Sequence, residues 1–409
     1  MRNGISAFAL ALLLYVLYSM GGIFAPVLFL LPSNLSFVEM VTQAHNFWRF
    51  GDYIHKGPFD GSVITIYTTL SPFLNQRHLI VGMAIGLTII WLASRTAKGW
   101  RTFAVFGIII GLTTRIHIVI AVSTAIVVAI MLLGERKKEL ASFAATFFVA
   151  AAGHVFSLRE GIAIQWLNPG YLAPRPLTFG SWLSFWVANL GVLIILIPIA
   201  LRRADGKGRR ILLGAGVIFF VANSVQVSYR MEHNHSLINY AVVLALPSVA
   251  GLLARWLRTR RFVAICALFL ATISGLFNLM VVKNDYQAMI DDVLKSGFMR
   301  WVQTTPKRSV FVSKHVLYDP VTIAGRKNYL GMEYYVTVMG YDYWGRRKQI
   351  DWWFRNFDQN APVQMKKENI DYIAVPRDGK DFPYSIDEKE VKKILRTAYE
   401  DDLYTVYEL

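Results

Sequence analysis

Residues 229–240 read YRMEHNHSLINY and separate two strongly apolar runs. The stretch brings together a cationic, an acidic and two imidazole side chains, from Arg230, Glu232, His233 and His235. Ionisable groups are costly to hold at a bilayer boundary away from water, so this cluster predicts a functional site. The alternative interpretation is a solvated turn that only joins two helices.

The composition is that of a membrane protein. The chain has 409 residues, 55% hydrophobic and 14% aromatic, with a mean hydropathy of +0.40, which is too apolar for an ordinary soluble protein. Residues 1–282 hold 23 Lys and Arg against 8 Asp and Glu, whereas residues 283–409 hold 20 against 19. We therefore predict a transmembrane domain at 1–282, with an aromatic membrane-surface loop at 32–77, and a soluble domain at 283–409.

The excess positive charge of the first domain lies mostly in four short segments between apolar runs. They comprise residues 95–101, 136–138, 202–210 and 255–261. Loops rich in Lys and Arg face the cytoplasm, so residues 229–240 and the soluble domain are predicted to face the other side. Because this charge is a topology signal, we predict no nucleic-acid partner.

The apolar runs predict the order of the membrane-spanning helices. Ile5–Leu31 is long enough to cross roughly 30 Å of hydrocarbon and is predicted to be a retained first helix. FLNQRH at residues 73–78 opens a second span, which ends at Ala93. Further spans are predicted at residues 140–156, 182–201, 211–227, 237–254 and 262–282.

Residues 103–133 are too few for two full crossings, yet they lie between two basic loops. If both loops are cytoplasmic, the segment must be a pair of short helices that meet partway across the membrane. Arg115 and His117 would then lie at the tip of the pair. The alternative is one long helix, with one of the two loops on the other side.

The soluble domain is predicted to be a small α/β sandwich. Residues 284–303, 343–357 and 387–399 are predicted helices. Four short runs rich in β-branched and aromatic residues are predicted strands, namely Ser309–Ser313, Val321–Gly325, Asp371–Pro376 and Leu403–Leu409. Strands that alternate with helices indicate parallel pairing.

Few groups on the predicted outer side could act as a general base. The carboxylates there are Glu39, Asp52, Asp60, Glu160 and Glu232. Glu232 ranks first because Arg230, His233 and His235 beside it can keep a carboxylate ionised and offer donors to an anion. Glu232, His233 and His235 could also hold a divalent cation, but no fourth ligand accompanies them, so we predict no metal site and leave a cation as an open alternative.

Four further cationic groups are predicted on the same side, at helix ends or at the tip of the short-helix pair. They are Arg77, His78, Arg115 and His117. A basic pocket of this kind suits a phosphate headgroup. For each arginine, the alternative is a side chain that merely extends to the lipid headgroups.

Several motifs taken together resemble the GT-C type of membrane glycosyltransferase. They are FLNQRH (73–78), GLTTRIH (111–117), SFWVANLG (184–191) and EHNHSLINY (232–240), followed by YDPVTIAGRKNYLG (318–331), MGYDYWGRR (339–347) and IDYIAVP (370–376). The resemblance implies a helical bundle, a polyprenyl-phosphate-linked sugar donor on the outer face and a carboxylate base. Members of the family usually begin with several more spans and an acidic first outer loop, whereas one predicted span precedes residue 32 here.

The sequence therefore predicts a mainly α fold: a polytopic transmembrane helical bundle followed by a small extracytoplasmic α/β domain, in the plasma membrane of a prokaryote. The predicted activity is hexosyl transfer from a polyprenyl-phosphate-linked sugar, with Glu232, Asp52 and Asp60 as candidate bases. The predicted ligands of the lipid phosphate are Arg77, His78, Arg115, His117, Arg230, His233, His235 and Arg326. The alternatives are a non-catalytic or split subunit that has a partner membrane subunit, and a transporter.

Overall fold

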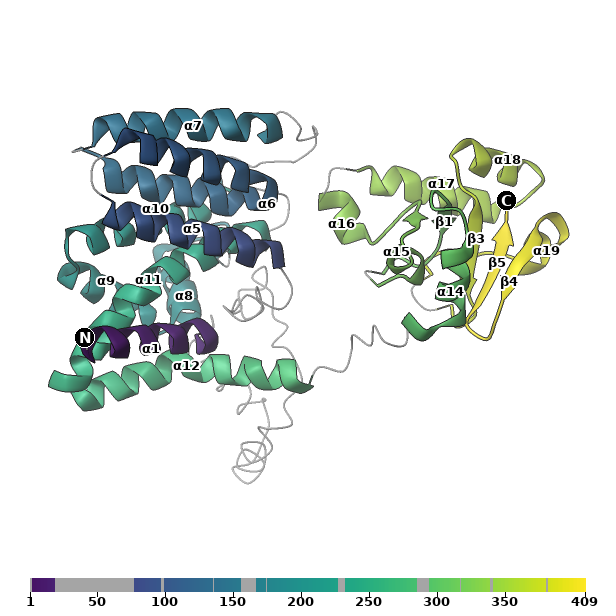
Figure 1. The fold of residues 1–409 in the computed structure, drawn as a ribbon. Helices are drawn as coiled ribbons and strands as arrows, with labels where there is room; N and C mark the ends of the chain where they lie inside the picture. Colours follow the sequence, from purple (N-terminus) through teal and green to yellow (C-terminus); the bar gives the residue numbers. More distant parts are fainter. Residues whose placement is uncertain are drawn as a thin grey trace, which may run out of the picture. The chain divides into compact units, whose positions relative to one another are not determined.

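A computed structural model of the chain describes residues 2–18, 77–96, 99–134, 136–155, 167–173, 175–226, 232–284, 294–316, 318–338, 341–379 and 382–409. The chain forms two compact units, drawn in Figure 1. The first unit contains the helices from α1 to α12. The second contains a small sheet and the helices from α14 to α19.

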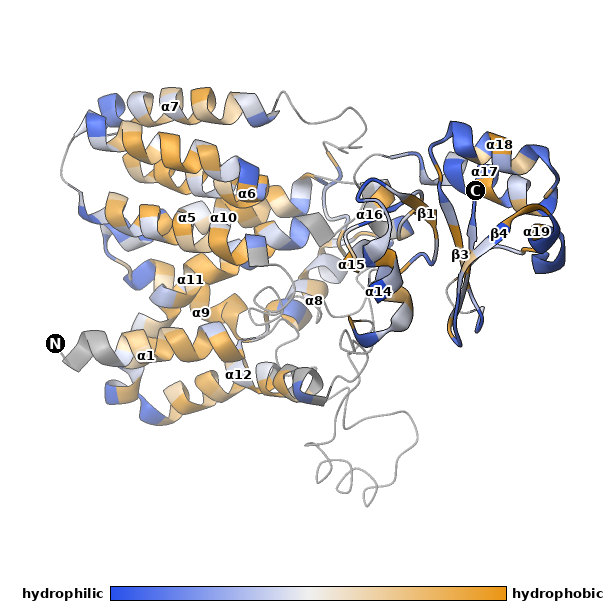
Figure 2. Cartoon of the chain, turned by 45° about the vertical axis from the view of Figure 1, so that its right-hand side comes forward, coloured by the Kyte–Doolittle hydropathy of each residue, from blue (hydrophilic) through white to orange (hydrophobic). Residues whose placement is uncertain are grey.

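The helical unit is built from long apolar helices. They are α1 (Arg2–Leu17), α5 (Arg77–Arg95), α6 (Trp100–Leu132), α7 (Lys137–Val155), α8 (Phe179–Leu190), α9 (Leu193–Arg203), α10 (Gly206–Ser224), α11 (Glu232–Thr259) and α12 (Arg261–Asn284). Within the described ranges, three helices are by length and composition alone sufficient to cross a membrane: α5, α6 and α11, with α6 counted as one helix although its backbone is interrupted at His117. The bent pair of α8 and α9 would make a fourth span if it acts as one. Figure 2 shows hydrophobic residues along these helices.

Helix α6 folds back on itself. His117 has an extended backbone (φ −157°, ψ 99°) inside an otherwise helical segment. A straight helix of this length would separate its two ends by roughly 50 Å. Instead, Arg136, just after the last turn of α6, lies 4.7 Å from the ring of Phe103 in the first turn. The predicted pair of short helices is therefore confirmed, with arms at 100–116 and 118–132, and the single long helix is wrong.

The first arm of α6 packs closely along α7. Thr146 on α7 donates its hydroxyl to the carbonyl oxygen of Ala104 at 2.8 Å. Gly107 and Gly111, spaced by four residues, face the same helix, and a Cβ atom on Gly111 would lie 2.7 Å from the carbonyl oxygen of Phe147. Small residues at this spacing let two membrane helices approach at their backbones.

Hydrogen bonds between helices bring the basic segments together at one end of the helical unit. Arg136 donates to the carbonyl oxygen of Thr96 at 3.4 Å, and Arg210 donates to that of Met131 at 2.9 Å. These bonds join three of the four basic segments at one end of the unit, and α11 runs toward the same end. We call this the basic end, and we call the opposite end, which holds the α6 reversal, the tip end. In Figure 2, hydrophilic residues lie toward the ends of these helices and hydrophobic residues lie between them.

One predicted helix of this unit needs correction, and the extent of another lies outside the described residues. The single return helix predicted at 182–201 is broken into α8 and α9, which meet at 84°. Gly191 lies at the break with φ +54°, a backbone conformation that favours glycine. The first helix, predicted to reach Leu31, is helical up to Leu17 among the described residues, and the predicted surface loop at 32–77 falls almost wholly outside them.

The second unit is a five-stranded mixed sheet between two helical layers. Its strands are β1 (Val310–Val312), β2 (Lys327–Asn328), β3 (Tyr372–Pro376), β4 (Arg396–Glu400) and β5 (Tyr404–Glu408), in the order β2-β1-β3-β5-β4. Strand β1 is parallel to β2 and β3, which confirms the predicted parallel pairing, and β5 is antiparallel to β3 and β4.

Side chains alternate between the two faces of this sheet. Ile373 and Val375 of β3 pack into the core on one face, together with the helices α16 (Glu333–Val338), α17 (Tyr343–Arg355), α18 (Asn360–Lys367) and α19 (Glu388–Ile394). Ala374 between them packs on the other face, with α14 (Gly297–Thr304) and α15 (Pro320–Ile323). This alternation follows from the two-residue repeat of a β-strand.

Two predicted elements of the second unit are wrong. The segment Val321–Gly325 lies in α15 and its following turn rather than in a strand, because Asp319 caps the helix and Pro320 occupies its first position. The helix predicted at 387–399 ends at Ile394, and the chain continues as β4. The predicted strands around Phe311, Ile373 and Val406 are confirmed.

Candidate functional site

The reversal of α6 presents His117 and Arg115 at the tip end. The ring nitrogen Nδ1 of His117 accepts a weak hydrogen bond of 3.4 Å from the backbone N–H of Ile120, so the side chain caps the second arm that it begins. Arg115 is exposed at the end of the first arm, and its guanidinium lies beside Gly153 of α7. The fold thus places a cation and an imidazole where two short helices meet.

A second imidazole lies against the first. His78, in the first turn of α5, stacks on His117 with ring centroids 5.4 Å apart and an angle of 16° between the rings. Gly82 one turn later makes this approach possible, since a Cβ atom there would lie 3.3 Å from the Cβ of His117. His78, Arg115 and His117, which were predicted from separate segments, therefore share the tip end.

The start of α11 lies at the same level. The hydroxyl groups of Tyr240 and Thr124 are 2.7 Å apart, which aligns α11 with the second arm of α6. At 1.5 Å per residue, Glu232 lies about 12 Å from Tyr240 along its helix, and His117 lies about 10 Å from Thr124 along the other. The N-terminus of α11 and the α6 reversal thus reach the same end of the unit, and the dipole of a helix favours an anion near its N-terminus.

The polar residues that follow Glu232 are buried rather than presented to solvent. Asn234 donates to the carbonyl oxygens of Ala222 and Val225, at 3.0 and 2.7 Å, and so closes the end of α10. His235 is only 2% exposed. The solvated-turn interpretation is therefore wrong for this part of the stretch. The imidazole of His235 therefore packs inside the helical unit, and its predicted contact with a lipid phosphate stays a prediction.

Arg326 also has a role that differs from the predicted one. It lies in the α/β unit, where its guanidinium donates to the carbonyl oxygens of Gln303, Thr305 and Ala324. These bonds tie the end of α14 to the turn after α15, and they occupy the donors that a lipid phosphate would need.

Several predicted site residues lie outside the described part of the chain. They are Asp52, Asp60 and Arg230, together with the side chains of Arg77, Glu232 and His233. Among the described residues, no three His, Cys, Asp or Glu side chains come together as a metal site. The alternative of a cation held by Glu232, His233 and His235 stays open, because the side chains of Glu232 and His233 lie outside the described part of the chain.

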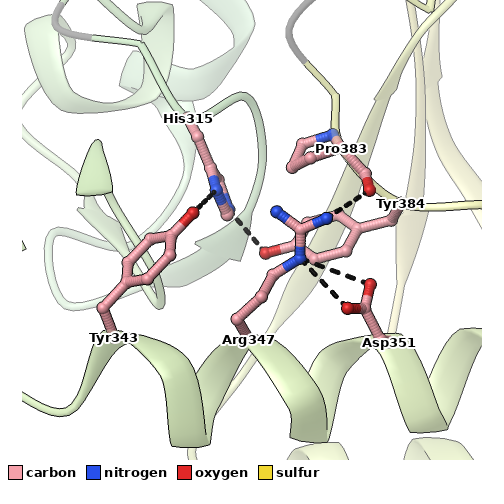
Figure 3. Close-up of polar contacts among 6 residues, drawn as sticks. All are labelled: His315, Tyr343, Arg347, Asp351, Pro383 and Tyr384. Carbon is pink, nitrogen blue, oxygen red and sulfur yellow. Dashed lines mark hydrogen bonds and ion pairs between the residues drawn. The ribbon is translucent and has the colours of Figure 1, made fainter.

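The α/β unit holds a polar cluster that sequence reasoning missed, shown in Figure 3. His315 follows β1, and its two ring nitrogens face the hydroxyl groups of two tyrosines. Nδ1 lies 3.1 Å from the hydroxyl of Tyr343 on α17, and Nε2 is hydrogen-bonded to that of Tyr384. One ring nitrogen donates and the other accepts, which a neutral imidazole can do with two phenols.

An arginine completes this cluster. Arg347, one turn after Tyr343 on α17, donates to Asp351 and to the carbonyl oxygen of Pro383, and its guanidinium lies 4.7 Å from the centre of the Tyr384 ring. Burial, with a contribution from this positive charge, lowers the pKa of His315 to about 4. The imidazole is therefore neutral at physiological pH.

The cluster joins three segments that are distant in the sequence. His315 comes from the loop after β1, Tyr343 and Arg347 from α17, and Tyr384 from a loop after β3. Because both ring nitrogens of His315 are engaged, the imidazole serves to hold these segments together and is not available as a free base. The sequence signal was the spacing of Tyr343 and Arg347 by four residues within MGYDYWGRR, which puts both side chains on one face of a helix.

No protein-family model matches this chain, and no curated protein matches its sequence. The fold defines a broad class on its own. Over the residues that the structure describes, the protein is mainly helical, with three helices that are long and apolar enough to cross a membrane and a small sheet region toward the C-terminus.

Proposed function

We propose that this protein is an integral membrane glycosyltransferase of the GT-C type, which takes a sugar from a polyprenyl-phosphate carrier at the tip end of its helical unit. The observation that supports this proposal most is the reversal of α6, which brings Arg115, His117 and His78 to one end. Interrupted helices at membrane depth are tolerated where protein or a water-filled cavity satisfies the backbone. The four basic segments gather at the opposite end, which suits a cytoplasmic side.

The proposed reaction is a direct displacement. The acceptor hydroxyl attacks the anomeric carbon of the sugar, the bond from that carbon to the phosphate oxygen breaks, and the lipid phosphate leaves. A carboxylate takes the proton from the acceptor, and Glu232 is the first candidate because α11 begins at the tip end. Arg115 and the stacked imidazoles of His78 and His117 stabilise the negative charge on the departing phosphate.

A matched pair of arginines tests this assignment. Arg101 and Arg115 are both exposed on the first arm of α6, Arg101 at the basic end and Arg115 at the tip end. With a polyprenyl phosphate that carries a radiolabelled hexose, Arg115→Gln should lower transfer by about 10²-fold, the usual effect of losing one stabilising donor. Arg101→Gln should leave transfer unchanged. Equal activity of the two variants would remove the tip end from the mechanism.

The second candidate function is a non-catalytic subunit of a membrane glycosylation assembly. The observation that favours it is the position of the acidic side chains. The acidic side chains that the structure describes in the helical unit are Glu139 and Asp205, and both lie at the basic end. At the tip end, the candidates for a general base are therefore carboxylates that the structure does not describe, those of Glu232, Asp52 and Asp60. If the purified protein transfers no sugar alone but does so with a partner subunit, and Glu232→Gln changes nothing, the subunit assignment holds.

The interrupted helices are also what a transporter would use. Transporters place broken helices at equivalent positions of two structural repeats. Here the breaks differ, since α6 reverses at His117 whereas α8 and α9 meet at 84°. The sequence holds no internal repeat, so we rank this function third.

A further inference from the structure

One face of α17 carries two large aromatic side chains that the α/β unit leaves uncovered. Trp344 is 58% exposed and Trp352 is 53% exposed. Lys348 and Arg355 are also exposed and lie on the same face. Counted from Trp344, the positions of Lys348, Trp352 and Arg355 are four, eight and eleven residues later, which places all four side chains within about 80° around the helix. We call these four residues the tryptophan stripe.

The opposite face of α17 anchors the helix firmly. Ile350, Trp353 and Phe354 are buried and pack into the core above the sheet. The tryptophan stripe therefore points outward because the other face is already occupied, and it is not a side effect of a loosely placed helix. Exposed apolar surface that is rimmed by charge usually marks a binding site.

The chemistry of the stripe fits a lipid surface. Indole rings settle at the level of the headgroups, where their apolar body is in the acyl boundary and their N–H remains hydrated. Lys and Arg beside them are attracted to anionic lipids. Helix α17 carries four basic residues, Arg346, Arg347, Lys348 and Arg355, against the single carboxylate of Asp351, which already pairs with Arg347.

The chain itself keeps this surface near a membrane. The apolar helix α12 ends at Asn284, and the next described residue is Leu294. Ten residue steps reach at most about 35 Å. When the apolar helices of the first unit lie in a membrane, a unit tethered in this way has a bilayer surface within reach, at a high effective concentration.

We propose that the tryptophan stripe is a membrane-docking surface, which inserts Trp344 and Trp352 among the headgroups of anionic lipids while Lys348 and Arg355 bind their phosphates. This inference does not depend on the glycosyltransferase function. It gives the α/β unit a defined orientation, with α17 against the lipid and α14, on the other face of the sheet, toward water.

The test uses the full chain in nanodiscs of either phosphatidylglycerol or phosphatidylcholine. Cys266, the single cysteine, is replaced by serine, and a nitroxide is attached at Asn356→Cys, beside the stripe, or at Gln303→Cys on α14 as the control. Both native residues are exposed. In phosphatidylglycerol, the label at 356 should lose collisions with a water-soluble nickel chelate and gain collisions with oxygen, whereas the label at 303 should not change.

Two sets of variants extend the test. Lys348→Gln and Arg355→Gln each remove one positive charge and should each lower the docked-to-undocked ratio by roughly fivefold. Trp344→Ser with Trp352→Ser should restore nickel access at 356. Because all four side chains are exposed, the melting temperature should not change, which separates lost docking from a lost fold.

Two results would overturn the proposal. Equally high access of the nickel chelate to the label at 356 in both lipids would mean that the stripe stays in water. Loss of both nickel and oxygen collisions in both lipids would mean that protein covers the stripe, either a partner or a second copy of the chain.

Discussion

His315 and Asp319 follow the same strand, and burial moves their pKa values in opposite directions. The pKa of His315 falls to about 4, and that of Asp319 rises to about 7. The cause is shared, because removal from water penalises the charged form of either group. Asp319 keeps this raised value although the backbone N–H of Val321, the hydroxyl of Ser313 and the cation of Lys314 all favour its ionised form.

The raised pKa of Asp319 predicts a pH-dependent stability of the α/β unit. The unfolded chain releases this proton near the ordinary value of 3.8, whereas the folded unit holds it to about pH 7. Asp319 therefore contributes its full stabilisation to the folded unit below pH 3.8. As the pH rises from 3.8 to about 7, this stabilisation is lost at about 1.4 kcal/mol per pH unit.

Asp319→Asn should remove this slope. We expect the difference in free energy of unfolding between native protein and variant to change by about 2–3 kcal/mol between pH 5 and pH 7. Hydrogen exchange of the β1 and β3 amides in the full chain measures it locally. His315 has the opposite slope below its ordinary pKa, but it is present in both proteins and cancels in the difference. An identical pH dependence of the two proteins would show that Asp319 is ionised in the fold.

At the scale of elements, the contact between α6 and α7 depends on glycine. Gly111 faces backbone atoms of α7, whereas a Cβ atom on Gly216 of α10 would meet nothing within 4 Å. Gly111→Ala should therefore lower the stability of the helical unit by about 1–3 kcal/mol through overpacking. Gly216→Ala should be neutral or slightly stabilising, because alanine favours a helix more than glycine does. Thermal unfolding in detergent compares the two variants, and equal melting temperatures would contradict the close contact.

The reversal of α6 makes a separate prediction about distance. Arg101 and Leu133, at the two ends of the helix, are both exposed and can carry spin labels. A straight helix would hold the labels roughly 50 Å apart, and the folded-back arms should bring them to less than half of that. Pulsed electron resonance on the labelled protein distinguishes the two cases. A broad distribution centred near the longer distance would mean that α6 crosses as one helix.

At the scale of the whole molecule, the gathering of positive charge at one end predicts topology. Residues 202–210 join α9 to α10 at the basic end, next to the loop that precedes α7. A tag inserted at 202–210 should be cytoplasmic by the positive-inside rule, and a tag after Leu409 should be outside. Protease added to sealed cells should therefore remove the second tag and spare the first. Removal of the first tag in intact cells would invert the assignment.

Sequence patterns predicted much of this architecture because the patterns are local. Hydropathy and charged loops located both ends of α5, α7, α10, α11 and α12 to within five residues. The length of the segment at 103–133, set between two basic loops, predicted the α6 reversal, since the number of residues limits how far a helix can reach. The break between α8 and α9 escaped prediction, because one glycine with a positive φ decides it within a continuous apolar run.

The tertiary structure alone decided which side chains meet. His315 lies 28 residues before Tyr343 and 69 before Tyr384, and no periodicity in a sequence relates positions so far apart. Burial of His235 and the carbonyl bonds of Arg326 likewise depend on neighbours from other elements. The sequence by itself determined apolar helices, basic segments and most strands, because these follow from composition and short-range repeats. Only packing decided which predicted site residues are exposed and which are held inside, because burial depends on the elements that cover a residue.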